Sequence, residues 1–207
     1  MRRDRRLRRR LVGGDSGQTL PIYIWLTGIL LFVAFAFFAF AQGASARNGA
    51  QTAADAAALA AAQDARDELV DGLELAIGDG DDWLDWLVGD RFEGLGAQAA
   101  ANALAAENDS TVSVTRDEVN GYPGFRADVE TNYTVGDSII PGTESQHAKA
   151  HATAVIKPRC DFDPSADPEK PVELVCDGED PVEIDPDDFE PGDLPDASVL
   201  FSVLLAD

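Results

Sequence analysis

The sequence predicts an α+β fold in which one long N-terminal transmembrane helix continues into a small ectodomain with an antiparallel sheet. Three observations predict this class. Residues 19–41 form an uncharged run rich in Leu, Phe and Ala. Residues 42–77 are dominated by Ala, the strongest helix former, and contain no proline. Beyond residue 110, apolar and polar residues alternate in several segments, as they do in half-buried strands.

Residues 19–41 are long enough to cross a membrane. A helix of this length covers roughly 35 Å, whereas a hydrocarbon core is about 30 Å thick. A single helix also satisfies its own backbone polar groups in lipid. Ala39-Phe40-Ala41 resembles a signal-peptidase cleavage site. However, the apolar core of a cleaved signal is only about 7 to 15 residues long. We therefore favour a retained single-pass anchor over a secretory signal.

Charge is distributed very unevenly along the chain. Residues 1–14 contain seven Arg and one Asp, whereas residues 15–207 contain nine basic and 37 acidic residues. A basic block beside an apolar span marks the cytoplasmic side and suits anionic lipid headgroups. We therefore expect residues 1–18 to be a basic cytoplasmic segment that contacts membrane lipid. The rest of the chain is expected to be extracytoplasmic and too acidic to bind nucleic acid.

Small residues recur at helical spacing in residues 42–157, which we expect to form a helical rod and a small α+β head. One row consists of Ala46, Ala50, Ala54, Ala58 and Ala62. A neighbouring row consists of Gly49, Ala53, Ala57 and Ala61. Such rows let another element approach closely. Two alternatives remain open: the rows pack on the protein's own sheet, or they pack on neighbouring subunits, including copies of this chain.

The head is predicted to contain two more helices. Residues 78–80 end the long helix, and Asp81 or Asp82 is placed to cap a short helix with two Trp residues. A second Ala-rich helix is expected over residues 94–107.

Alternating segments predict three antiparallel strands, at residues 111–115, 125–135 and 147–156. The Gly-Tyr-Pro-Gly sequence at residues 121–124 is expected to connect the first two.

His147 and His151 are predicted to share a strand face with Lys149. A cation between two histidines favours a solvated face over a metal site.

Residues 158–195 differ from the head in composition. Eight of the 11 prolines and many acidic residues fall here, which predicts an extended or disordered acidic linker. Cys160 and Cys176 are expected to form a disulfide in an oxidising compartment. The loop of about 15 residues that it closes corresponds to roughly 3 kcal/mol of chain entropy. Residues 196–207 are expected to dock as an apolar C-terminal strand.

No catalytic or cofactor motif is evident in the sequence. It contains no phosphate-binding glycine loop, no GxSxG, no HExxH, no CxxC and no dinucleotide fingerprint. We therefore predict that the protein is not an enzyme and needs no cofactor or metal.

Three segments resemble one family. Residues 51–62 (QTAADAAALAAA), residues 16–20 leading into the span, and residues 102–108 followed by TVSVT are similar to TadE/TadG-like proteins of Flp (tight adherence) pilus assembly. The resemblance covers about residues 13–115. It implies a pilin-like fold and a minor pilin-like or assembly role in a Tad/Flp-type pilus or secretion apparatus, whose other subunits would be the partners.

Two features differ from the family pattern. Gly17 and Gln18 form a candidate prepilin-type processing site, but Ile22 stands where such sites normally carry Glu. The acidic tail lies outside the recognisable core, and the DxSxS metal motif of larger members is absent. The alternative hypothesis is therefore a stand-alone anchored extracytoplasmic binding or adhesion protein that uses its acidic tail.

Overall fold

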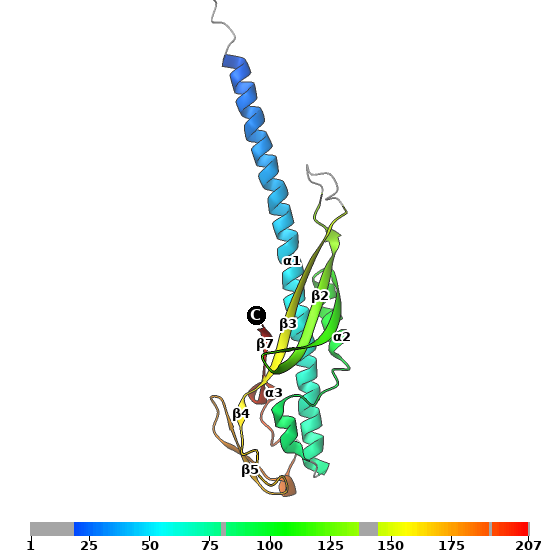
Figure 1. Ribbon diagram of the computed structural model, residues 1–207, viewed down its shortest axis with the longest axis vertical. Coiled ribbons are helices and arrows are strands. Elements are labelled where there is room, and N and C mark those ends of the chain that lie inside the picture. Colours follow the sequence, from blue (N-terminus) through cyan, green and yellow to red (C-terminus); the bar gives the residue numbers. More distant parts are fainter. Residues whose placement is uncertain (1–18, 80–81, 137–144, 191, 207) are drawn as a thin grey trace, which may run out of the picture.

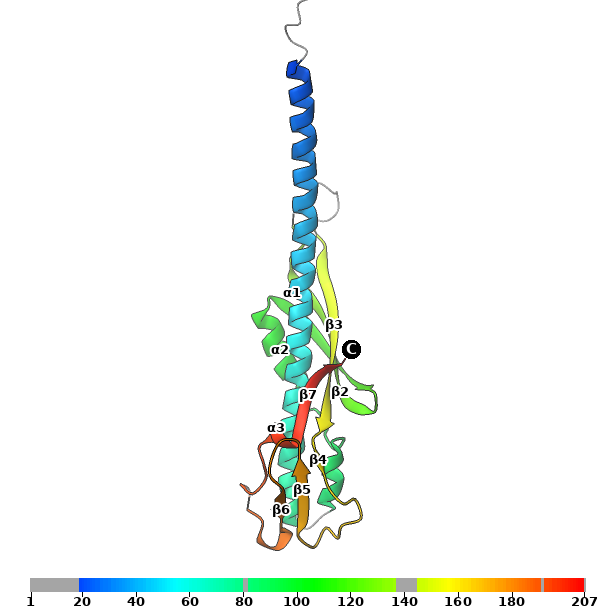
Figure 2. The same cartoon turned by 90° about the vertical axis from the view of Figure 1, so that its left-hand side faces the viewer.

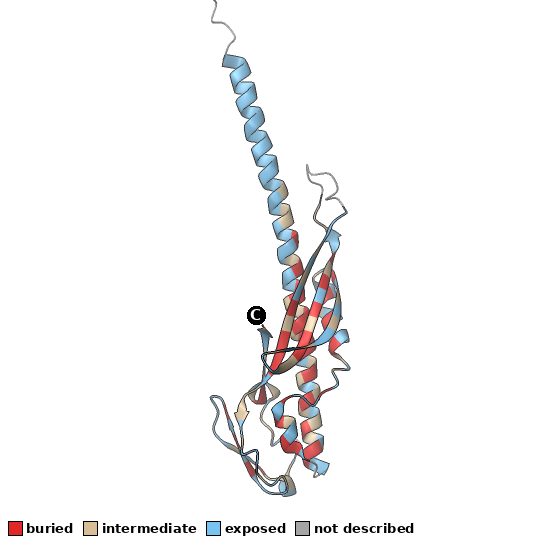
Figure 3. Ribbon diagram, viewed as in Figure 1, coloured by how far each residue is buried: buried red, intermediate tan, exposed pale blue. Residues whose placement is uncertain are grey.

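Helix α1 (Thr19–Asp79) runs unbroken for 61 residues, or about 90 Å, through the computed structural model (Figure 1). The structure describes residues 19–79, 82–136, 145–190 and 192–206. The first part of α1 stands free, and the rest is covered by the head (Figure 3). The predicted α+β fold, with a long apolar helix leading into a small antiparallel head, is therefore confirmed.

The head is built on a four-stranded antiparallel sheet with the order β1-β2-β3-β7. These strands are β1 (Ser110–Val119), β2 (Tyr122–Thr134), β3 (His147–Pro158) and β7 (Phe201–Ala206). The predicted alternation holds, because one face of the sheet is buried and the other carries polar residues. In β2, for example, Phe125, Ala127 and Val129 are buried while Asp128 is exposed.

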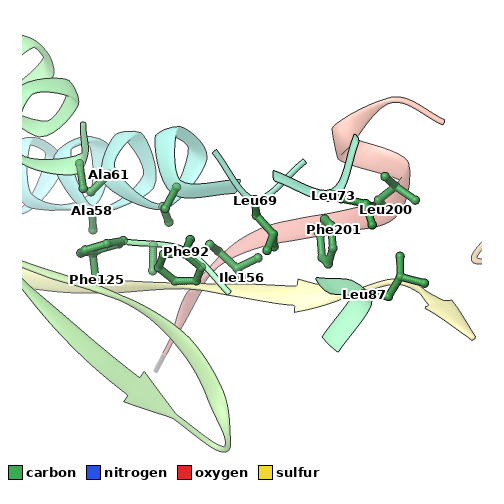
Figure 4. Close-up of a cluster of buried hydrophobic side chains, with 14 of the residues drawn as sticks. Ala58, Ala61, Leu69, Leu73, Leu87, Phe92, Phe125, Ile156, Leu200 and Phe201 are labelled. Carbon is green, nitrogen blue, oxygen red and sulfur yellow. The ribbon is translucent and has the colours of Figure 1, made fainter. Parts of the chain in front are cut away.

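Helix α1 and the shorter α2 (Ala97–Glu107) cover the buried face of the sheet. The core is alanine-rich where α1 meets the middle of the sheet and contains larger residues toward the end of α1. There Leu69 and Leu73 join Leu87 of the 3₁₀ helix η1 (Trp83–Val88) and Phe201 of β7 (Figure 4). The buried side chains that α1 contributes therefore become larger toward the end of the helix.

The turn between β1 and β2 lies one step earlier than the sequence predicts. Residues 121–124 were expected to form it, but Val119 pairs with Tyr122 and the turn consists of Asn120 and Gly121. Their φ values are 56° and 83°. A two-residue hairpin of type I′ needs positive φ at both positions, which Asn and Gly tolerate best. Tyr122 and Pro123 consequently belong to β2.

The acidic segment after β3 is more ordered than the sequence predicts. Residues 158–195 were expected to be an extended or disordered linker, yet they contain the three-stranded sheet β4 (Cys160–Asp161), β5 (Val172–Cys176) and β6 (Val182–Ile184). In β5, Val172, Leu174 and Cys176 are buried while the residues between them are exposed. This alternation gives the segment an apolar face, which the composition of the whole stretch conceals. The 3₁₀ helix η2 (Pro186–Asp188) follows.

The C-terminal residues form the strand that the sequence predicts. After the short helix α3 (Ala197–Leu200), β7 pairs antiparallel with β3 from Thr153↔Ala206 to Pro158↔Phe201. β7 is therefore the edge strand of the sheet, beside β3 (Figure 2).

Long-range polar contacts fix the start of α2. The carboxylate of Glu68 in α1 accepts hydrogen bonds from the backbone N–H groups of Glu93, Gly94 and Leu95, at 2.7, 2.9 and 3.2 Å. These contacts hold the approach to α2 in a non-helical conformation, with Gly94 at φ 67°. The second helix therefore begins at Ala97, later than predicted. Of the two predicted caps of η1, Asp81 lies outside the described residues, and Asp82 makes no side-chain capping bond.

Two glycines of α1 make room for aromatic rings. The Tyr133 hydroxyl lies where a Cβ on Gly49 would stand, and the Trp86 ring lies where a Cβ on Gly72 would stand. Glycine normally weakens a helix by about 1 kcal/mol relative to Ala. In α1 this cost is offset by the close packing that both glycines permit.

Replacing Gly72 by Ala should therefore destabilise the protein despite the better helix propensity of Ala. The new Cβ would displace the Trp86 ring from α1, so we expect Gly72→Ala to lower the thermal unfolding midpoint of the full chain in detergent, measured by circular dichroism. Gly78→Ala is the matched control, because no other group lies within 4 Å of that Cβ position. It should gain up to about 1 kcal/mol. Equal gains in both variants would contradict the close packing at Gly72.

Candidate membrane anchor and helix-packing surface

The first part of α1 presents an apolar surface that nothing in the head covers. Every large apolar side chain from Leu20 to Phe40 is exposed, at 45–76% of its area. The most apolar 18-residue window of the helix has a mean hydropathy of 2.4, and none of it is buried. Among the described residues this is the one helix long and apolar enough to cross a membrane. Such a continuous apolar surface suggests membrane anchoring.

The head begins almost directly after this apolar surface. Residue 41 is the last of the apolar run, and Ala46 is the first buried residue of α1, at 5% exposure. The intervening helix is about 7 Å long. The end of β2 extends to this level, because Tyr133 lies over Gly49 and Val135 lies beside Gly43. The helix therefore passes from a bare apolar surface to a packed one within a few residues.

The predicted small-residue rows lie inside the protein's own head. Ala50, Ala54, Ala58 and Ala62 have no exposed area, and neither do the neighbouring Ala53, Ala57 and Ala61. Helix α1 packs here against β2, β3 and α2. Of the two alternatives left open by the sequence, the structure therefore supports packing on the protein's own sheet, with α2 as an additional contact.

The side of α1 that faces away from the sheet is polar. Asn48, Thr52, Gln63, Asp67 and Asp71 are exposed on it. A neighbouring helix could not pack on the buried alanines without opening the head. Lateral contacts through small apolar residues therefore remain available only in the free part of α1.

The disulfide predicted from the sequence is present. Cys160 and Cys176 are bonded and join β4 to β5. Within the loop that the bond closes, Asp163 accepts hydrogen bonds from the backbone and hydroxyl of Ser165, and these bonds lower the pKa of its carboxyl. The bond and the turns together keep the acidic segment folded against the head.

Three further predictions from the sequence concern the histidine-bearing face of β3, a metal site and a processing site. His147, Lys149 and His151 are all exposed on β3, and Lys149 forms an ion pair with Glu130 at 3.0 Å. In the part of the chain that the structure describes, no group of three or more His, Cys, Asp or Glu is arranged to hold a metal ion. The candidate processing site, Gly17 and Gln18, lies outside the described residues.

Asp64 is the carboxylate of α1 with a raised pKa. Burial is the largest cause, and the negative charges of Glu68 and Asp67 add to it. Asp64 lies against Gly96 at the start of α2, so close that a Cβ on Gly96 would overlap its carboxylate. Together with the hydrogen bonds of Glu68, this contact positions α2 on α1.

Enlarging a buried alanine of α1 should destabilise the head. We expect Ala58→Leu to cost about 1–3 kcal/mol, because the added atoms would push β2 and β3 away from the helix. Ala44→Leu is the matched control in the same helix, since Ala44 is exposed. Chemical unfolding of the full chain in detergent, followed by near-ultraviolet circular dichroism, compares the two. An unchanged stability of Ala58→Leu would contradict the close packing of this row.

Comparison with known proteins finds one family that the first part of the chain resembles. A family model described as "Tad: Putative Flp pilus-assembly TadE/G-like" matches residues 17–64. The matched segment includes the free apolar part of α1 and the first turns buried in the head. No curated protein and no solved structure matches the chain. The resemblance, which the sequence predicts over about residues 13–115, is confirmed over residues 17–64, and this likeness supports a role in Flp pilus assembly.

Proposed function

We propose that the protein is a membrane-anchored, minor pilin-like or assembly subunit of a Tad/Flp-type pilus or secretion apparatus. The observation that carries the proposal is the single helix α1, whose free half is apolar and whose other half organises a small α+β head. The family match spans the junction between these halves. The proposed role of the protein is structural and depends on contacts with other subunits of the apparatus.

In the proposed orientation, residues 1–18 lie in the cytoplasm and the head lies outside the membrane. The seven Arg residues before the span support this direction, because basic residues are retained on the cytoplasmic side. The disulfide between Cys160 and Cys176 also fits an extracytoplasmic compartment.

The proposed contacts with other subunits divide between the two parts of α1. In the membrane, the free half can meet neighbouring helices and lipid, and Gly28 leaves open space for close approach. Outside the membrane the alanine rows are already occupied. Partner subunits must therefore contact the polar side of α1 or the outer surface of the head.

We further propose that the mature protein keeps both residues 1–18 and its apolar segment. Ile22 replaces the Glu of a prepilin-type site after Gly17, and the apolar run is longer than a signal core. Mass spectrometry of the purified protein tests this point: a chain that begins at Met1 supports a permanent anchor. A chain that begins at Gln18 would instead indicate pilin-type processing, and one that begins at Gln42 would indicate secretion.

Assembly of surface pili in the native host tests the function. Deleting the gene should abolish or strongly reduce Flp-type pili, counted by electron microscopy. The full chain should restore them, whereas residues 42–207 exported behind a cleavable signal should not, because the released head lacks contacts within the membrane.

A full chain with Gly78→Ala is the control for expression and handling, since that substitution meets open space. Normal pili in the deletion strain would refute the proposed role.

The alternative, a stand-alone anchored binding or adhesion protein, is favoured by one observation. The acidic β4–β6 segment lies at the end of the head farthest from the apolar half of α1 (Figures 1 and 2), where it is best placed to meet an external ligand. Removing residues 158–207 would also remove β7 from the main sheet, so reversing exposed charges such as Glu179 and Asp180 is the cleaner experiment. Lost attachment with normal pili would favour this alternative.

A further inference from the structure

Two adjoining hollows lie beside the last turns of α1, at the end of the helix farthest from the apolar segment. Their volumes are about 440 and 650 Å³. Gly72, Leu75, Trp86 and Arg91 line both, so the two form one continuous depression between α1, η1 and residues 90–93. We call this depression the distal groove.

The floor of the distal groove is apolar. Leu75 is 69% exposed, although it lies on a helix whose next residue, Ala76, belongs to the core. The Trp86 ring lies across Gly72 and is half-buried, so that one side of it packs on α1. An exposed leucine beside an indole ring forms a surface that gains free energy when an apolar side chain covers it.

The rim of the distal groove is negatively charged. Asp71, Asp79, Asp82, Asp90 and Glu93 are exposed on it, and none of them forms an ion pair with another described residue. These carboxylates therefore create a negative potential around the apolar floor.

The two cations that line the groove are already engaged. Arg91 pairs with the carboxylate of Asp85, and the guanidinium of Arg116 lies 4.7 Å from the centre of the Phe92 ring. Neither neutralises the rim carboxylates through an ion pair.

We propose that the distal groove binds a segment of a partner protein in which an apolar side chain is flanked by Lys or Arg. The apolar side chain would cover Leu75 and Trp86, and the flanking cations would meet the rim carboxylates. Charge complementarity of this kind determines which partners bind and how fast they associate.

The head of a second copy does not fit the groove. Residues 42–207 contain nine basic and 36 acidic residues, a net charge of −27, so two heads repel each other. Leu7 of this chain is flanked by Arg, but in the proposed orientation it lies on the cytoplasmic side of the membrane, away from the groove. The inference deepens the proposed function by naming a docking surface and its partner chemistry, and it rests on that function only for the compartment in which the partner is met.

A short synthetic peptide tests the groove directly. The probe is a fluorescein-labelled peptide with one Leu between two pairs of Lys, and the comparison peptide has Ser in place of Leu. Fluorescence anisotropy measures the binding of each to the full chain in neutral detergent at about 150 mM salt, where long-range attraction is screened. We expect the Leu peptide to bind about tenfold more tightly than the Ser peptide.

Groove variants should weaken binding of the Leu peptide by about tenfold. One is Leu75→Ser, and the other combines Asp71→Lys with Asp79→Lys. The matched controls are Leu204→Ser, at another exposed leucine, and Glu179→Lys with Asp180→Lys, which changes net charge equally between β5 and β6. The controls should leave affinity unchanged within about twofold. All the substituted side chains are exposed, and circular dichroism checks that each variant keeps its fold.

Three results would overturn the inference. Equal weakening by both charge variants would mean that the head attracts cations without a specific groove. Equal affinity for the Leu and Ser peptides would mean that the apolar floor is not used. Self-association in sedimentation that Leu75→Ser abolishes would make a second copy the occupant. Each of these results leaves the pilus-assembly experiment unaffected, so failure of this inference is distinguishable from failure of the proposed function.

Discussion

The close contact between the alanine rows of α1 and strands β2 and β3 is the constraint on which the rest of the protein depends. Alanine is the residue that both favours a helix and lets a sheet lie directly against it. Around Ala54 and Ala58 the helix contributes only small buried side chains, and the ring of Phe125 from β2 packs beside them (Figure 4). Farther along, Leu69 and Leu73 pack with buried residues of η1, α3 and β7. The glycines under Tyr133 and Trp86 extend the same principle to aromatic rings.

Much of this fold could be predicted from the sequence, because local patterns determine much of it. Helix propensity and hydropathy together define α1, and alternation defines β1, β2 and β3. The sequence could not identify the partner of the alanine rows, since small residues suit a sheet and a neighbouring helix equally well. The β5 strand was missed because proline and acidic residues dominate the composition around a short alternating run. The hydrogen bonds from Glu68 to residues 93–95 join distant parts of the chain, and no local pattern reveals them.

Charge is arranged along the length of the molecule as well as along the sequence. The segment from β4 to η2, at the end opposite the apolar half of α1, contains 13 acidic residues and one basic residue over residues 160–190. Near the apolar half, Arg47 is the first charged residue of α1. Negative charge is therefore concentrated away from the proposed membrane surface, where anionic headgroups would repel it. The distal groove lies near this acidic end, so a cationic partner would be drawn toward the end of the head farthest from the apolar half of α1.

The absence of a joint in α1 has a mechanical consequence. Helix α1 continues from the apolar segment into the packed head without a proline or a break in its hydrogen bonding. Only about 7 Å of helix separates the two. A rotation of the apolar segment would therefore turn the head through the same angle. Moving one helical turn of that segment out of lipid would raise the whole head by about 5.4 Å. The molecule would move as a rigid body. It would transmit rotation and displacement of the apolar segment directly to any partner bound to the outer surface of the head.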